Sequence, residues 1–170
     1  KRFGIPATIV MPETTPLVKV ENTRSQGARI VLHGETLYES ADKAREIAVA
    51  EQLTLIHPYD DAAIMAGQGT VALEMLADAP DLDMLIIPVG GGGLMAGNAI
   101  AARAIRPTIE LTGVEAELYP SFLNTMDRQN RPIGGPTLAE GIAVKTVGEL
   151  TLPIIRGLVA DIVPVSEELI

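Results

Sequence analysis

The sequence predicts an α/β fold built from open, mostly parallel sheets with helices on both faces. Apolar runs recur along the chain, and stretches in which apolar residues have helical spacing separate them. The apolar runs contain few polar residues, as is typical of strands buried on both faces of a parallel sheet. The helical stretches carry start and stop signals, such as Thr-Thr-Pro before the first one and a glycine after it. Such alternation is typical of α/β architecture.

The first third of the chain predicts the order strand, helix, strand, helix, strand. Thr15 and Pro16 provide an N-cap and a first-turn proline for the first helix, and Gly27 provides its C-cap. The second helix is amphipathic. The expected elements are strands at residues 7–11, 28–32 and 53–56 and helices at residues 14–27 and 40–52.

The rest of the chain continues the alternation with less regularity. Residues 128–136 are rich in Asn, Gly and Pro and predict a surface loop. Pro153 must lie in the first turn of its helix, because a proline further along would remove a hydrogen bond. The expected elements are a helix ending near residue 76, a strand at 84–89, a helix ending near 105, a strand at 109–114, a helix at 149–159 and a strand at 160–165.

Composition excludes several classes of function. The chain has 13 Lys and Arg against 22 Asp and Glu, a formal charge of −9, and only three Tyr and two Phe, so it lacks the basic surface and stacking aromatics of nucleic-acid binders. The absence of Cys excludes disulfides and thiolate zinc sites. Residues 84–102 are uncharged, but Pro88 and four glycines interrupt them, which excludes a membrane span. No apolar segment of signal-peptide length develops near the N-terminus, so a cytoplasmic protein is expected.

The strongest functional signal is the run of four glycines at residues 90–93, between an apolar strand and a helix. Its backbone N–H groups would lie at the positive end of the helix, which suits a phosphate. A tight turn with positive φ would explain only one or two of the glycines. No Gly-Lys-Ser/Thr follows, which argues against a nucleotide triphosphatase. Gly91, Gly93 and Ala96 also match a loosened dinucleotide-binding fingerprint, and Glu115 lies where a ribose-binding acid belongs, so an NAD-binding domain is the alternative.

A second polar cluster follows the third expected strand. It contains His57, Asp60 and Asp61 and continues into the Gly-Gln-Gly-Thr run of residues 67–70, which predicts a helix start with Thr70 near the N-cap. The carboxyl ends of parallel strands are the usual place for binding sites in open α/β sheets. Packing and capping explain the same residues at least as well.

Carboxylates end another expected strand. Glu115 and Glu117 would point to the same side, where they could hold a hard cation such as Mg²⁺, act in acid/base chemistry or form a solvated rim. Glu140 stands beside Gly141 after a loop. None of the four lysines lies in an apolar context that would lower its pKa, so the residues alone indicate no catalytic group.

Both ends of the sequence are typical of interrupted helices. Lys1 and Arg2 followed by Gly4 fit a helix C-terminus, and Ser166 followed by acidic residues fits a helix N-terminus. We therefore expect these 170 residues to be an internal piece of a longer chain.

The whole chain resembles the threonine dehydratase and serine racemase group, pyridoxal-phosphate enzymes of the tryptophan-synthase-β fold type, also called fold type II. The Gly-Gln-Gly-Thr run followed by the four glycines is highly specific to this group at the spacing found here. The matching stretches are GIPATIVMPETTPLVKVENTRSQGA, HPYDDAAIMAGQGTVALEML, PVGGGGLMAGNAIA, GVEAE, LAEGIAVKTVGELT and DIVPVSEELI.

The resemblance implies roles for particular residues. The cofactor phosphate would be bound by residues 90–93, that is Gly90, Gly91, Gly92 and Gly93, with Leu94 beginning the helix. Gly141 would lie close to the cofactor ring, and Glu115 would help to bind a cation. Relatives that use a divalent ion have a further carboxylate where this chain has Ser121, so a monovalent ion, a divalent ion or none is compatible with it.

The resemblance also shows what the sequence lacks. The Schiff-base lysine of the family lies in a Ser-Phe-Lys-x-Arg-Gly-Ala segment that this sequence does not contain. Its Ser-x-Gly-Asn-His loop and the residue that faces the pyridine nitrogen are missing too. The 170-residue chain alone is therefore expected to be inactive.

The resemblance further implies two lobes with the cofactor in the cleft between them. Residues 1–54 would belong to a small α/β domain and residues 55–170 to a large cofactor-binding domain. The implied activity of the parent protein is elimination of water and ammonia from L-threonine or L-serine, which converts L-threonine to 2-oxobutanoate. Serine racemase and hydroxyaspartate dehydratase are alternatives within the family, and an NAD-binding oxidoreductase domain or a non-catalytic ligand-binding module are alternatives from other classes.

The expected setting follows from the same resemblance. We expect a cytoplasmic homo-oligomer, dimer or tetramer, that binds a small amino-acid substrate and takes part in amino-acid metabolism such as isoleucine biosynthesis. Neither nucleic acid nor membrane is expected as a partner.

Overall fold

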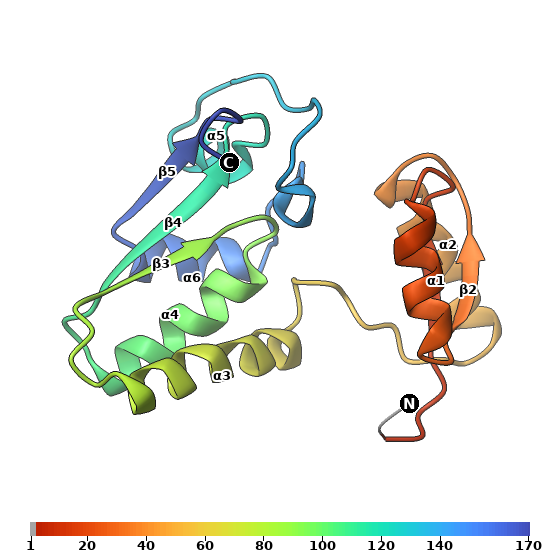
Figure 1. Ribbon diagram of the computed structural model, residues 1–170, viewed down its shortest axis with the longest axis horizontal. Helices are drawn as coiled ribbons and strands as arrows, with labels where there is room; N and C mark the ends of the chain where they lie inside the picture. Colours follow the sequence, from red (N-terminus) through yellow and green to blue (C-terminus); the bar gives the residue numbers. More distant parts are fainter. Residues whose placement is uncertain (1–2) are drawn as a thin grey trace. The chain divides into compact units, whose positions relative to one another are not determined.

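The computed structural model describes residues 3–170 and divides into two units, Lys1–Ile56 and His57–Ile170. The helix end expected at Lys1 and Arg2 lies outside the described residues. Unit 1 contains, in chain order, β1 (Thr8–Met11), α1 (Leu17–Ser25), β2 (Arg29–Leu32) and α2 (Leu37–Ala50). Unit 2 contains α3 (Ala62–Asp78), β3 (Met84–Pro88), α4 (Gly93–Ile105), β4 (Glu110–Ala116), α5 (Ser121–Met126), a 3₁₀ turn η1 (Glu140–Ile142), α6 (Thr151–Leu158) and β5 (Asp161–Val165) (Figure 1).

Unit 1 is a parallel β-α-β arrangement followed by a helix. β1 and β2 pair in parallel, with Thr8 opposite Arg29 and Met11 opposite Leu32. α2 begins at a capping box in which the Thr36 hydroxyl accepts from the N–H of Glu39 and the Glu39 carboxylate accepts from the N–H of Thr36. This cap places the start of the helix three residues earlier than residue 40, where the sequence pattern put it.

The strand expected at residues 53–56 is wrong. In the structure this segment has no strand pairing, and the Ile56 side chain is 64% exposed. An apolar run becomes a strand only where a neighbouring backbone supplies its hydrogen bonds. In the described part of unit 1, the sheet consists of β1 and β2 alone, so the segment is an extended connection that leads into unit 2.

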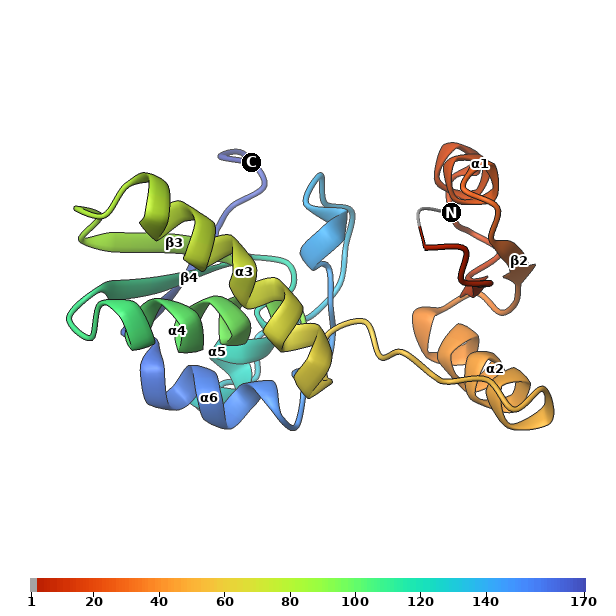
Figure 2. The same ribbon diagram turned by 90° about the horizontal axis from the view of Figure 1, so that it is seen from below.

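Unit 2 is built on a parallel sheet in the order β3-β4-β5. Met84 pairs with Glu110 at one end of the β3-β4 ladder, and Ala116 pairs with Val165 at the end of the β4-β5 ladder. Figures 1 and 2 show α3, α4 and α6 together on one face of this sheet. The predicted α/β class with parallel strands is thus confirmed.

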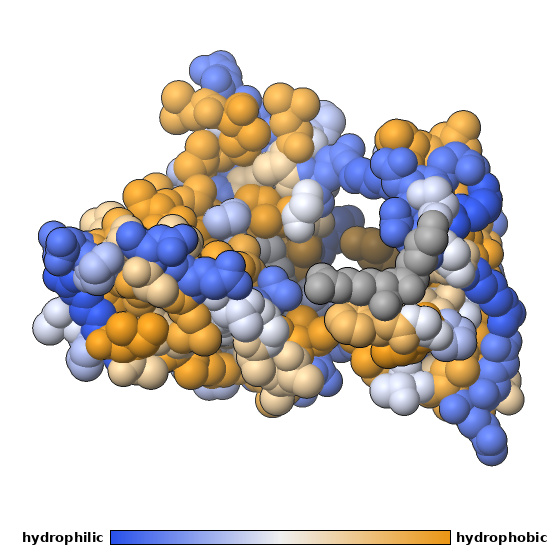
Figure 3. All heavy atoms as spheres, turned by 60° about the horizontal axis from the view of Figure 1, so that its bottom comes forward, coloured by the Kyte–Doolittle hydropathy of each residue, from blue (hydrophilic) through white to orange (hydrophobic). Residues whose placement is uncertain are grey.

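β3 is buried on alternate residues rather than on both faces. Leu85 and Ile87 are buried under the helices, whereas Met84, Ile86 and Pro88 are exposed on the opposite face. The reason is that no helix of residues 57–170 covers that face in the structure. Figure 3 shows further exposed apolar side chains (orange) on the side of unit 2 that includes α3. Apolar surfaces of this kind usually contact other polypeptide.

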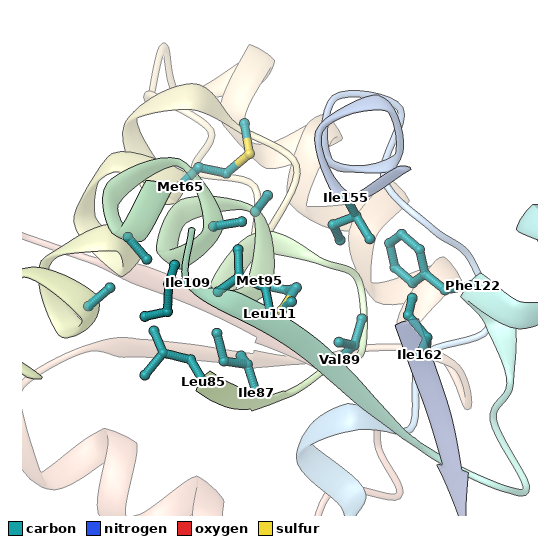
Figure 4. Close-up of a cluster of buried hydrophobic side chains, with 14 of the residues drawn as sticks. Met65, Leu85, Ile87, Val89, Met95, Ile109, Leu111, Phe122, Ile155 and Ile162 are labelled. Carbon is teal, nitrogen blue, oxygen red and sulfur yellow. The ribbon is translucent and has the colours of Figure 1, made fainter. Parts of the chain in front are cut away.

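The core of unit 2 is one contiguous cluster between the sheet and the three helices. Figure 4 shows that it continues from the α3–α4 contact around Met65 and Met95 to Val89 and Phe122, next to the segment that follows β3. Its larger members are Met65, Leu85, Ile87, Val89, Met95, Ile109, Leu111, Phe122, Ile155 and Ile162. The core therefore supports the start of α4, where the glycines lie.

α3 begins earlier than the sequence predicted. Asp61 is its N-cap and accepts from the N–H groups of Ala63 (2.8 Å) and Ile64 (3.0 Å), so the start predicted near Thr70 is wrong. The Gly-Gln-Gly-Thr run lies in the middle of the helix. Gly69 faces α4, where a Cβ on Gly69 would lie 2.8 Å from the carbonyl oxygen of Gly97. The glycine thus allows two helix backbones to approach closely, and it does not begin a helix.

Two features of the second half agree with expectation, and two short elements were missed. The surface loop at residues 128–136 has no helix or strand, and Pro153 lies in the first turn of α6. α5 and η1 were not predicted. Across residues 3–170, the helices are all too short or too polar to cross a bilayer.

Candidate functional site

The glycine segment joins the end of β3 to the start of α4. The N–H of Val89 still bonds to the carbonyl of Val114 (2.8 Å), and Gly92 then turns the chain with φ +94° as the N-cap of α4. Among the described residues, no acceptor meets the N–H groups of residues 90–95, although residues 91–93 are buried. Unpaired buried N–H groups are costly, and here they lie at the positive end of a helix. The segment is therefore a candidate anion-binding site.

The packing of the loop explains all four glycines. A Cβ on Gly91 would lie 2.3 Å from the ring of Tyr59, and one on Gly93 would lie 2.7 Å from the Tyr59 carbonyl. A Cβ on Gly92 would lie 2.7 Å from both the Phe122 ring and the Thr151 hydroxyl. Gly90 is less tightly restricted, because a Cβ there would lie 3.0 Å from the backbone of residue 142. The expectation that a turn needs only one or two glycines is corrected, and the case for an anion rests on the unpaired N–H groups.

Two segments that are distant in sequence hold this loop. The Thr151 hydroxyl donates to the carbonyl of Gly91 (2.8 Å), and the N–H of Gly148 donates to the same oxygen (3.3 Å). The Asp60 carboxylate caps the start of α6 by accepting from the N–H groups of residues 149, 150 and 151. His57 Nδ1 in turn accepts from the N–H of Asp60 (2.8 Å), which fixes the turn that carries the carboxylate.

The structure thus divides the second polar cluster. Asp60 and His57 lie beside the glycine loop as structural supports, Asp61 caps α3, and residues 67–70 serve the contact between α3 and α4. The roles of Thr151 and Gly148 were not predicted. No local pattern marks them, since they act on a carbonyl about sixty residues earlier in the chain.

The segment that contains Gly141 also lies beside the loop. A Cβ on Gly90 would be 3.0 Å from Ile142 Cα and 3.1 Å from Val144 Cγ2. Val144 is held by the Ser121 hydroxyl, which donates to its carbonyl. Gly141 itself is exposed, and a Cβ there would meet nothing within 4 Å. The structure therefore brings this segment and the glycine loop together.

Leu94 is the second residue of α4, and its side chain is half-buried. With Pro88, Met75 and Asn98 it lines a shallow, mostly apolar groove. Its N–H belongs to the unpaired set described above.

Glu115 is fully buried at the end of β4 and caps α5. Its two carboxylate oxygens accept from the N–H groups of Phe122 (2.7 Å) and Leu123 (3.1 Å). Burial raises the pKa of Glu115, and these two N–H groups act in the opposite direction. Glu117 lies past the end of β4 and is exposed. Residues 3–170 bring together no group of three or more His, Asp or Glu side chains, so a cation at Glu115 stays a prediction that needs backbone carbonyls as ligands.

The raised pKa of Glu115 has a consequence for stability. The folded protein keeps the proton on Glu115 above pH 4.5, where the unfolded chain loses it, so the free energy of unfolding falls as pH rises through this window. Urea unfolding at a series of pH values should show a steeper fall for the wild-type protein than for Glu115→Gln, which cannot titrate. Glu117→Gln is the control on an exposed carboxyl. If the free energy of unfolding fell equally with pH in the wild-type protein and in Glu115→Gln, the proton on Glu115 would not contribute to the pH dependence of stability.

Comparison with known proteins gives the family. The model of the family described as pyridoxal-phosphate dependent enzyme matches residues 1–170. The chain belongs to this family. The L-threonine ammonia-lyase of Thermotoga maritima is 42% identical over 168 residues, which are 98% of this chain and 42% of that protein. The catabolic L-threonine dehydratase of Staphylococcus aureus strain N315 is 42% identical over 172 residues, which cover 99% of this chain and 49% of that protein.

Solved structures of related enzymes also match this chain. Maize serine racemase matches with a TM-score of 0.91 and 32% identity over 98% of this chain and 51% of that one. The processed threonine deaminase isoform 2 of Solanum lycopersicum matches with a TM-score of 0.88 and 36% identity over 97% of this chain and 46% of that one. The chain spans about half the length of the relatives that it matches.

Family membership decides between the alternatives raised by the sequence. The fold type II resemblance is confirmed, and the NAD-binding alternative is set aside, because this is a family of pyridoxal-phosphate enzymes. The glycine loop suits that cofactor: its unpaired N–H groups can donate to a phosphate, and its packing leaves no room for side chains on residues 91–93.

Proposed function

We propose that this chain forms the phosphate-binding part of a pyridoxal-phosphate-dependent L-threonine ammonia-lyase, which converts L-threonine to 2-oxobutanoate and ammonia. The buried N–H groups at the start of α4 carry this proposal. The relatives named L-threonine ammonia-lyase and L-threonine dehydratase supply the reaction class.

In this proposal each part of the loop has a defined task. The N–H groups of residues 90–94, from Gly90 to Leu94, bind the cofactor phosphate, and the dipole of α4 favours its negative charge. Gly141, in the segment beside the loop, leaves space for the cofactor ring. Bound pyridoxal phosphate supplies an electron sink for loss of the substrate's α-proton. The protein anchors and orients the cofactor.

The proposal extends to the organisation of the protein. Residues 1–54 form part of a small α/β domain and residues 55–170 part of a large domain that binds the cofactor. Glu115 contributes to a monovalent or divalent cation site. The parent protein is a cytoplasmic homo-oligomer, either a dimer or a tetramer. The Staphylococcus relative is named catabolic, so the name supports amino-acid metabolism in general and not isoleucine biosynthesis in particular.

Serine racemase is the second candidate, because the structure of maize serine racemase matches 98% of this chain. Hydroxyaspartate dehydratase is a further candidate of the same family. The two main candidates differ in what they release. A lyase forms ammonia and a 2-oxo acid from L-threonine, whereas a racemase forms D-serine from L-serine, so measuring both products from each amino acid separates them.

The proposed phosphate site is tested by comparing two cofactor forms. We expect pyridoxal phosphate to bind at least about tenfold more tightly than pyridoxal, equal to about 1.4 kcal/mol, because only the phosphate reaches the loop N–H groups. Both compounds carry the same aldehyde, so the difference isolates the phosphate. Titration calorimetry with each compound measures it. Equal affinity would contradict a phosphate site at residues 90–94.

Intact mass spectrometry after borohydride reduction tests the expectation that the 170-residue chain alone is inactive. A protein of 18.0 kDa without a phosphopyridoxyl adduct is expected for the 170-residue chain, since the lysine segment of the family is absent from its sequence. An adduct on a chain of this mass would contradict the expected inactivity.

A further inference from the structure

The peptide between Gly91 and Gly92 is the part of the loop that most needs to be held. Glycine adopts positive and negative φ about equally well, so a peptide between two glycines rotates at little steric cost. Rotation by half a turn would exchange the directions of the Gly91 carbonyl and the Gly92 N–H. Because the peptide is planar and trans, these two groups point in opposite directions. Fixing the carbonyl therefore fixes the N–H.

The start of α6 fixes that carbonyl. The Gly91 oxygen accepts from the Thr151 hydroxyl at 2.8 Å and from the N–H of Gly148 at 3.3 Å, so the hydroxyl makes the shorter contact. Thr151 is fully buried, and its oxygen lies 3.4 Å from its other neighbour, the Gly148 carbonyl. The Gly92 N–H consequently points away from α6, toward the side on which the N–H groups of residues 90–95 have no acceptor among residues 3–170.

The backbone around Thr151 is itself held in place by Asp60. The Asp60 carboxylate accepts from the N–H groups of Glu149 (2.9 Å), Leu150 (2.9 Å) and Thr151 (3.3 Å). A Cβ on Gly148 would lie 2.3 Å from this carboxylate, so Gly148 lets it approach the helix end. The chain of contacts thus runs from Asp60 through the start of α6 and the Thr151 hydroxyl to the Gly91 carbonyl.

We propose that Thr151 is a positioning residue whose hydroxyl sets the orientation of the Gly91–Gly92 peptide and thereby the affinity of the loop for phosphate. The proposal rests on the proposed function, since it assumes that an anion binds at residues 90–94. Thr151 is not expected to touch the anion. Its effect passes through the Gly91 carbonyl to the N–H of Gly92.

Replacing the hydroxyl tests the proposal. Thr151→Val keeps the shape and removes the hydroxyl, and we expect it to weaken binding of pyridoxal phosphate and of inorganic phosphate by about tenfold, or about 1.4 kcal/mol. Thr151→Ser keeps the hydroxyl and should bind both within about threefold of the wild-type protein. Thr125→Val is the control, because the Thr125 hydroxyl donates to the Ser121 carbonyl within α5 and not to the loop.

The outcomes separate this proposal from the proposed function. If the wild-type protein binds neither compound, the phosphate site itself is wrong. If the wild-type protein binds and Thr151→Val binds equally well, only the role of Thr151 is overturned. Equal weakening by Thr151→Val and Thr151→Ser would also overturn it, because the hydroxyl would then not be the cause.

A measurement on the wild-type protein keeps the test valid if Thr151→Val does not fold. During a phosphate titration followed by NMR, the amide proton of Gly92 should shift downfield together with those of its neighbours in the loop. The Thr151 hydroxyl proton should be protected from exchange with water. A Gly92 amide that does not respond while the amides of Gly91 and Gly93 do would overturn the proposal.

Discussion

Gly97→Ala is expected to destabilise the protein by about 3 kcal/mol, at the upper end of the usual cost of overpacking. A Cβ on Gly97 would lie 2.1 Å from the carbonyl oxygen of Met65 and 2.8 Å from the backbone nitrogen of Gly69. Both are backbone atoms of α3, so relief requires the two helices to move apart. That movement would open the core around Met95 and Ala96, which are fully buried. Urea unfolding of the wild-type and variant proteins measures the effect.

Gly67→Ala is the matched control in the same pair of helices. Gly67 is exposed in α3, and a Cβ there would meet nothing within 4 Å. Alanine has the higher helix propensity, so this variant should be more stable than the wild-type protein by about 0.5–1 kcal/mol. Gly69→Ala should again destabilise, since its Cβ would lie 2.8 Å from the Gly97 carbonyl. If Gly97→Ala and Gly67→Ala had the same effect, the close approach of α3 and α4 would be wrong.

The sequence predicted those elements whose signals are local. The apolar run at residues 84–89 gave β3, and the apolar run that begins at residue 160 gave β5 within one residue. The expectations that the structure contradicts have a common physical cause. In each case, residues distant in the chain decide which structure forms. Residues 53–56 are apolar but find no strand to pair with. The sequence around Gly69 predicts a helix start, whereas in the structure Gly69 lies within α3 and allows the close contact with Gly97 of α4.

The candidate site shows the same division. The glycine run could be recognised from the sequence as an anion loop, because its function depends on consecutive N–H groups at a helix start. The residues that hold the loop could not be recognised. Thr151 acts on Gly91 across 60 residues, and Asp60 acts on the start of α6 across about 90. The glycine count was also over-interpreted, since a Cβ at each of residues 91–93 would clash with neighbouring side-chain or backbone atoms and one at Gly90 would be tightly placed.

Gly91→Ala is expected to weaken the binding of pyridoxal phosphate by about 100-fold, equal to about 2.7 kcal/mol. The Cβ that this substitution adds would lie 2.3–2.4 Å from three carbon atoms of the Tyr59 ring. The ring cannot yield easily, because it is half-buried and its hydroxyl donates to the Thr146 carbonyl at 3.2 Å. The loop must therefore move instead, and its N–H groups then lose their common direction.

The double variant Gly91→Ala, Tyr59→Ala decides whether the clash is the cause. Removing the ring makes space for the new methyl group, so affinity should return to within about tenfold of the wild-type protein. Gly92→Ala should not be rescued by Tyr59→Ala, because that Cβ would meet Phe122 and Thr151 and the residue has φ +94°. Gly157→Ala on α6, where a Cβ meets nothing within 4 Å, is the control for the substitution itself. Calorimetry measures the affinity of each variant for pyridoxal phosphate. If the double variant bound pyridoxal phosphate as weakly as Gly91→Ala, then Gly91 would be needed for binding the anion and not for packing against Tyr59.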